Sequence, residues 1–142
     1  MIQNRMDANL RTHKFHDLSQ FGLRIVVGVF FIVHSQMKFG SGFGGFLQSI
    51  GLPSEMAILI GLLESVGGVL LIVGVLSRIA SAVIAIDMLG AIIYVKKAQS
   101  FSGKNGIELE LLAFIILLTI MVLGPGRISL SHIIKKIPRI LQ

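Results

Sequence analysis

Four long apolar segments dominate the sequence, at about residues 21–39, 56–76, 79–95 and 107–123. Each has about 17–21 residues, roughly the length a helix needs to cross a 30 Å hydrocarbon layer at 1.5 Å per residue. Lipid offers the backbone no hydrogen bonds, so continuous apolar runs of this kind cross as helices. The pattern therefore predicts an all-α fold, a four-transmembrane-helix bundle in a polytopic integral membrane protein.

Composition supports a lipid environment. Of the 142 residues, 54% are hydrophobic and only 14% are charged, whereas soluble domains carry about 25% charged residues. A chain this short cannot bury so much apolar surface in one core. The formal charge of +6 does not predict nucleic-acid binding, because the basic residues flank the apolar segments. We expect the lipid bilayer as a partner and no nucleic acid.

The absence of cysteine narrows the chemistry. Disulfides, thiolate metal sites and iron–sulfur ligation are excluded. His34 is the one histidine inside a predicted span, so a bis-histidine haem site between helices is not expected. No metal-spaced histidine pair occurs either, and the sequence predicts no metal site and no covalently bound cofactor.

The connections between the apolar segments differ in character. Residues 40–55 are rich in glycine and carry no Lys or Arg, which predicts an irregular or re-entrant loop. Segments two and three are joined only by Ser77 and Arg78, so they should form a tight antiparallel hairpin. The Gly-Pro-Gly run at 124–126 should end the fourth helix, because proline cannot continue it and glycine suits its C-terminal cap.

Three regions and an orientation follow. Residues 1–18 read as a cytoplasmic tail without a signal peptide, 19–127 as the membrane domain, and 128–142 as a basic amphipathic segment on the inner leaflet. We expect the protein in the plasma membrane, and the positive-inside rule places both termini on its cytoplasmic side. Nine basic residues fall on the inner side, against four on the outer side (Lys38, Lys96, Lys97 and Lys104).

Two acids, Glu64 and Asp87, lie near the middle of the second and third predicted spans. A charge at the bilayer centre costs roughly 2.5–3.5 kcal/mol, so each acid is a candidate site residue. Glu64 shares a helix face with Gly61, Gly67 and Gly68, where another helix can approach closely. Asp87 on the next segment should lie at a depth within about 6 Å of Glu64, so one cation could serve both acids. Either acid could simply lock the packing, or could handle protons or a ligand.

Cationic candidates cluster near the ends of segment one. His34 and Lys38 are one turn apart and face one way, which could create a cationic site near the outer surface. For Lys38 alone we favour slightly that it snorkels to the headgroups. For Arg24 we favour an inner-leaflet anchor over pairing with an acid of the bundle.

The start of segment four is acidic. Asn105 followed by Glu108 resembles a capping box at the start of a helix. Glu110 sits deeper and could face the outer mouth of the bundle beside His34 and Lys38. The candidate intramembrane polar site therefore consists of Glu64, Asp87, His34, Lys38, Arg24 and Glu110.

Most of the chain, roughly residues 19–131, resembles the DoxX family of small membrane proteins. The features that carry the resemblance keep their order along the chain. They are Leu23-Arg24 with Gly28, His34 followed by Lys38, Gly51-Leu52-Pro53, GLLESVGGVLLIVGVLSR with Gly61 and Glu64, Met88, NGIELELL at 105–112 and GPGRISL at 124–130. The resemblance implies a four-helix membrane bundle and a link to redox complexes, since the family includes membrane subunits of thiosulfate:quinone oxidoreductase.

Two functions remain open. The resemblance favours a membrane-anchoring subunit of a quinone-linked redox complex, connected with sulfur or oxidative stress. Such a subunit would be at most a non-catalytic or quinone-binding part of an oxidoreductase, with quinone as the expected cofactor. Partner redox subunits or further copies of the chain would complete the assembly. The alternative is a non-redox scaffold, or a small-solute or proton-coupled carrier.

Overall fold

The computed structural model describes residues 14–134, and within this range every regular element is helical. The long helix α2 spans Lys14–Gln36 and continues as a 3₁₀ turn, η1, at Met37–Phe39. Helix α4 spans Met56–Val73, α5 spans Ser77–Gly90, and α6 spans Glu108–Leu123. Helix α5 continues as a π-helical segment, η2, at Ala91–Val95. The prediction of an all-α fold is confirmed for the described residues.

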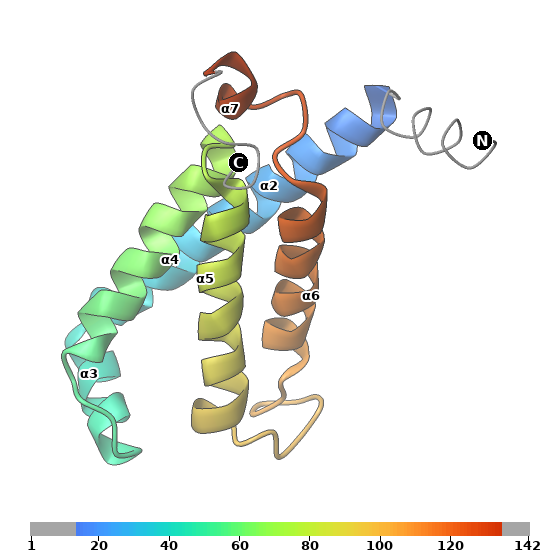
Figure 1. Ribbon diagram of the computed structural model, residues 1–142. Helices are drawn as coiled ribbons and strands as arrows, with labels where there is room; N and C mark the ends of the chain where they lie inside the picture. Colours follow the sequence, from blue (N-terminus) through green and yellow to red (C-terminus); the bar gives the residue numbers. More distant parts are fainter. Residues whose placement is uncertain (1–13, 135–142) are drawn as a thin grey trace.

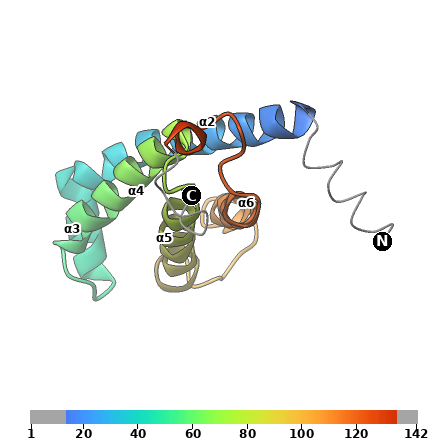
Figure 2. The ribbon, with the colours of Figure 1, turned by 45° about the horizontal axis from the view of Figure 1, so that its top comes forward.

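The four main helices form two packed layers. Helices α2 and α4 make one layer and α5 and α6 the other, with α2 running obliquely behind the rest (Figures 1 and 2). The short helix α3, Ser41–Ser49, lies against η1 and the start of α4. The two layers meet around apolar side chains with no exposed surface, one from each main helix: Phe31, Leu71, Ile84 and Leu117.

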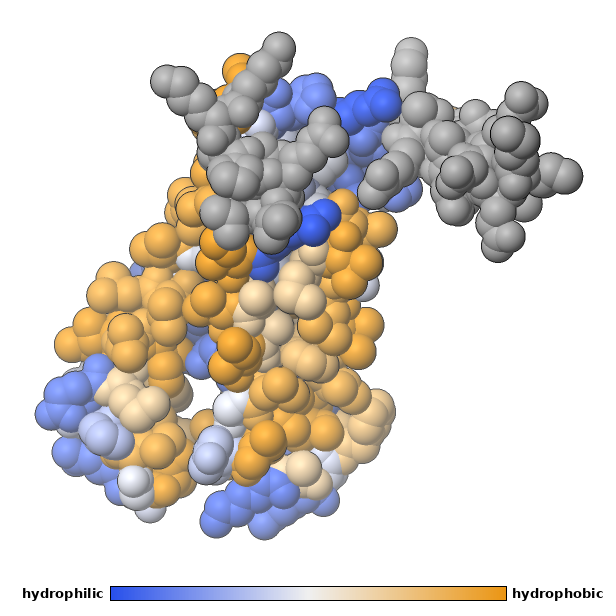
Figure 3. Space-filling view, viewed as in Figure 1, coloured by the Kyte–Doolittle hydropathy of each residue, from blue (hydrophilic) through white to orange (hydrophobic). Residues whose placement is uncertain are grey.

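Among the described residues, three helical stretches are long and apolar enough to cross a membrane: Phe15–Phe39, Met56–Val73 and Ser77–Val95. Large apolar side chains cover the outside of these helices, and Figure 3 shows them as a broad belt between hydrophilic ends. Helix α6 has 16 residues, about 24 Å of helical rise, which is shorter than the hydrocarbon layer. A bilayer environment is therefore supported, and the fourth crossing stays a prediction.

Glycines set the distance between the layers and within them. A Cβ atom added to Gly28 would lie 2.6 Å from the carbonyl oxygen of Gly68, and the reverse contact has the same distance. A Cβ at Gly67 would lie 2.6 Å from Cδ1 of Ile84 on α5. The expectation that this glycine face admits neighbouring helices closely is confirmed.

The connections follow the sequence in part. Helices α4 and α5 pack together with only residues 74–76 between them, so the predicted hairpin is confirmed, although Ser77 and Arg78 belong to α5. Gly124 ends α6, as expected, and its N–H bonds to the carbonyl of Ile120. The glycine-rich stretch, predicted to be an irregular or re-entrant loop, contains a regular helix, α3, at residues 41–49.

The start of α6 differs from the prediction, and the predicted terminal segments are described only in part. The N-cap of α6 is Ile107 and makes no side-chain hydrogen bond, so the capping box from Asn105 was wrong. The predicted tail at 1–18 and basic segment at 128–142 lie partly outside the described residues. Within them, residues 14–18 belong to α2, and the short helix α7 covers Leu130–Ile133.

Candidate functional site

A buried ion pair joins the end of the first span to the middle of the second. The Nζ of Lys38 lies 3.3 Å from Oε1 of Glu64. Glu64 has no exposed surface and Lys38 has 9%. Gly61, one turn before Glu64, makes the approach possible, because a Cβ there would lie 3.1 Å from Cβ of Lys38. The snorkelling interpretation of Lys38 was therefore wrong: a carboxylate within reach holds the ammonium inside the protein.

Asp87 completes this group from the other layer. Its half-buried side chain interacts electrostatically with both Lys38 and Glu64. It lies on the last full turn of α5 before the backbone changes to the π-helical η2, a local form that often occurs at functional sites. One cation faces two acids, as the depth argument predicted. We call Lys38, Glu64 and Asp87 the charged triad.

Two neighbours of the triad were missed by sequence reasoning. The ring of Phe43 on α3 lies 4.7 Å from Nζ of Lys38, a cation–π distance. Ser65, next to Glu64, shares a 2.6 Å hydrogen bond with Ser35 of α2. Phe43 stands in a glycine-rich stretch without helical periodicity, so nothing in the pattern indicated its position. Ser65 adjoins a flagged acid, which was the available signal.

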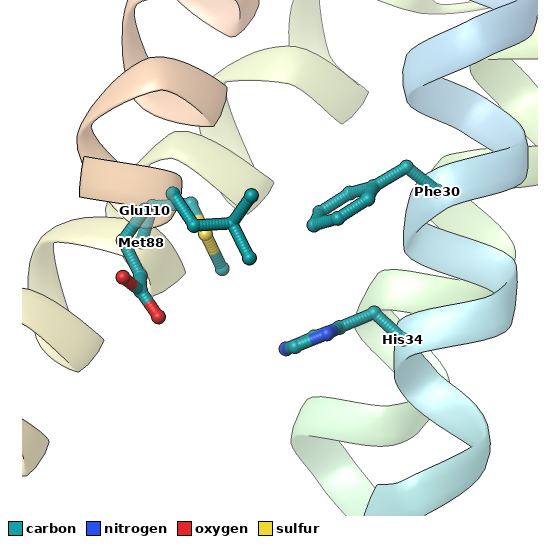
Figure 4. Close-up of a pocket in the computed structure, with 5 residues that line it drawn as sticks. Phe30, His34, Met88 and Glu110 are labelled. Atoms are coloured by element: carbon teal, nitrogen blue, oxygen red, sulfur yellow. The ribbon is translucent and has the colours of Figure 1, made fainter. Parts of the chain in front are cut away.

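A second polar group forms a small pocket between α2, α5 and α6. The rings of Phe30 and His34 are stacked, with centroids 5.4 Å apart and an interplanar angle of 14°. They face Met88 and Glu110 across the pocket (Figure 4). The space inside the pocket that a water molecule could occupy is about 10 Å³. That is room for about one water molecule, far below the roughly 300–1,000 Å³ of sites for drug-sized ligands, so a ring could enter only if lining side chains moved apart.

The side of this pocket formed by Glu110 is charged. Glu110 binds Lys96, with Oε2 2.8 Å from Nζ, and the same ammonium donates to the carbonyl of Gly106. His34 interacts electrostatically with Lys38, Glu110 and Lys96. Glu110 thus lies beside His34, as expected. The expected joint site of His34 and Lys38 does not form, because Lys38 turns to Glu64 while His34 lines the pocket.

Arg24 serves neither of its expected roles. It is 1% exposed, and its guanidinium donates from Nη1 to the carbonyl of Leu71 (3.3 Å) and from Nη2 to that of Ile128. The last carbonyls of a helix have no partner within it, and a guanidinium can satisfy carbonyls from two segments at once. Arg24 therefore ties the end of α4 to the segment after α6. It is neither a headgroup anchor nor the partner of a bundle acid.

The described residues contain no group of three or more His, Cys, Asp and Glu side chains that could hold a metal ion. The described polar groups are instead a few charged side chains inside a mostly apolar interior. The triad can exchange or hold a proton, and the pocket offers a stacked aromatic wall, an imidazole and a carboxylate.

Comparison with known proteins identifies the family of the chain. The DoxX family model matches residues 19–97, which is more than half of the chain. The chain belongs to the DoxX family. A relative from Bacillus subtilis (strain 168), named "Putative oxidoreductase CatD", is 34% identical over 103 residues, which cover 70% of this chain and 76% of the relative. No solved structure matches the chain. The family match includes Lys38, Glu64 and Asp87.

Proposed function

We propose that this DoxX protein is a membrane-anchoring subunit of a redox complex and binds a quinone headgroup. The stacked Phe30 and His34 rings facing Glu110 across a small pocket carry the proposal. A quinone ring needs a flat apolar surface and a hydrogen-bond donor at a carbonyl oxygen, and this pocket supplies both. The oxidoreductase name of the relative points the same way.

The pocket's size limits what the subunit does. The pocket has room for about one water molecule, so a quinone ring would enter by displacing lining side chains, and its isoprenoid tail would stay in the lipid. The sequence has no cysteine, so thiol-based electron transfer falls to a partner redox subunit. When bound, the quinone would accept or deliver electrons. The residues of this chain orient the ring and exchange protons with its surroundings.

The proposed membrane arrangement has four spans. Helix α6 packs along α5 in the same layer, and its ends carry the charged Glu108 and the Gly124 stop. In this arrangement α6 is the fourth span and residues 96–107 lie on the extracytoplasmic side. Both termini then lie on the cytoplasmic side of the plasma membrane. The Lys and Arg distribution supports this orientation. The membrane domain at 19–127 would then be flanked by two basic segments.

Quinone binding is the direct test. The protein is purified in detergent, co-purifying lipids are extracted and analysed for quinone, and a short-chain ubiquinone is then titrated. Wild type should bind one quinone per chain, and His34→Leu should weaken binding at least about tenfold, because a site that loses its hydrogen-bond partner discriminates strongly. His132→Leu is the matched control, since His132 is exposed on α7. No binding to wild type, or equal binding to both variants, would contradict the proposal.

A scaffold without quinone remains the second candidate, and the Lys38–Glu64 pair favours it. A closed, buried ion pair can specify how helices fit together without taking part in chemistry. In that case Glu64→Gln would alter the assembly with partner subunits while quinone remained unbound by either protein. Uptake of a solute into liposomes lacking quinone would instead indicate a carrier.

A further inference from the structure

We infer that the carboxyl groups of Glu64 and Asp87 together form a proton-binding site inside the membrane, occupied by one exchangeable proton. The inference deepens the proposed function by naming where a proton is held near the quinone pocket. The redox use of that proton rests on the proposed function, but its binding does not.

Charge in the triad is unbalanced without a proton. One ammonium faces two carboxylates, so the fully ionised group carries a net charge of −1. An uncompensated charge within a membrane span is costly, and such groups pair or neutralise instead. A single proton on the two acids makes the triad neutral. Within the described residues, no other cation interacts with Glu64 or Asp87.

The oxygens of Glu64 have different surroundings. Oε1 accepts from Lys38, whereas Oε2 is buried without a hydrogen-bond partner. The neighbouring carboxyl is that of Asp87, which only accepts when ionised. A proton shared by the two carboxyls supplies the missing donor. It also creates a short, charge-assisted O–H···O bond in place of repulsion between two anions.

The groups around Glu64 and Asp87 supply one cation, so one of the two carboxyls is left to hold a proton. Lys38 from η1 is the cation that faces both acids, and α3 contributes the ring of Phe43, which carries no charge. On α6, Glu110 is taken up by Lys96. The ammonium of Lys38 favours one ionised carboxylate, and the second acid then holds the proton.

Access to the site runs through Asp87. Glu64 has no exposed surface, whereas Asp87 is half-buried. Asp87 lies where α5 passes into η2 and diverges from α4 (Figure 1). The space-filling view shows a notch between the two layers toward this end (Figure 3). As the partly exposed member of the pair, Asp87 is where a proton would enter before it passes to the buried Glu64.

Infrared spectroscopy tests the inference without quinone. The protein is reconstituted in liposomes and measured in H₂O and D₂O for the C=O stretch of a protonated carboxyl. Wild type should show a band that shifts on deuteration and is lost in both Glu64→Gln and Asp87→Asn. Glu108→Gln is the matched control, because Glu108 is exposed at the start of α6. Helicity and elution volume establish that each variant is folded.

Lys38→Gln provides a second, opposite prediction. Without the ammonium, both acids should be protonated, and the band should rise about twofold. The inference is overturned if wild type lacks the band, if both single acid variants keep it, or if added sodium or potassium removes it. A band with no quinone binding would reject the proposed function alone, whereas quinone binding without the band would reject the proton site alone.

Discussion

Gly28 and Gly68 meet backbone to backbone where α2 crosses α4. This crossing fixes how the first two spans slide along each other. Glu64 lies one turn before Gly68 on α4, and Lys38 lies at the end of the same span as Gly28, so the contact determines whether the two charges can meet. The ion pair thus depends on the absence of two side chains several residues away from it.

The first prediction concerns this crossing. Gly28→Ala should lower the free energy of unfolding by about 1–3 kcal/mol, because the added methyl meets a backbone oxygen that cannot easily move. Reversible unfolding in mixed micelles measures it. Gly22→Ala on the same helix has nothing within 4 Å of the new Cβ, so it should be neutral or stabilising by about 0.5–1 kcal/mol. Equal effects of the two substitutions would contradict the close crossing.

The second prediction concerns the triad. Lys38→Met should destabilise by about 3–5 kcal/mol, because it removes the cation that faces the buried Glu64 and the half-buried Asp87. Glu64→Gln should cost less, since Lys38 keeps Asp87 as a partner. The same unfolding assay compares them, and the double variant Lys38→Met with Glu64→Leu should recover part of the loss. A larger effect of Glu64→Gln than of Lys38→Met would show that Asp87 does not share the cation.

Three of the spans were predictable because hydrophobic length is a local property of the sequence. The pairing of Lys38 was not, because snorkelling and burial have the same sequence pattern and differ only in where an acid on another helix lies. Arg24 illustrates the same limit: its acceptors are carbonyls of Leu71 and Ile128, and backbone acceptors leave no residue-type signal. The position of Glu64 was readable, because glycines one turn away on both sides marked a packed face.

The third prediction concerns Arg24. Arg24→Lys should lower stability by about 1.5–3 kcal/mol, the range for a hydrogen bond from a charged donor, because a single ammonium cannot span both carbonyls. Hydrogen exchange should rise at Ser131, whose N–H bonds to the carbonyl of Gly74. Arg127→Lys is the control. The Nε of Arg127 lies 4.0 Å from Oδ2 of Asp17 and the Arg127 side chain is about half exposed, so the free energy of unfolding should change by less than about 1 kcal/mol. Unchanged exchange at Ser131 would contradict the tie between α4 and the segment after α6.

The fourth prediction decides the number of spans. The native chain has no cysteine, so single cysteines report their own location. Ser102 and His132 are both exposed and lie on opposite sides of α6 along the chain. If α6 crosses the bilayer, Ser102→Cys should react with an impermeant maleimide in intact cells and His132→Cys only after permeabilisation. If α6 does not cross, both positions will share one side and label together, because a 16-residue helix that stays in one leaflet returns the chain to the face it came from.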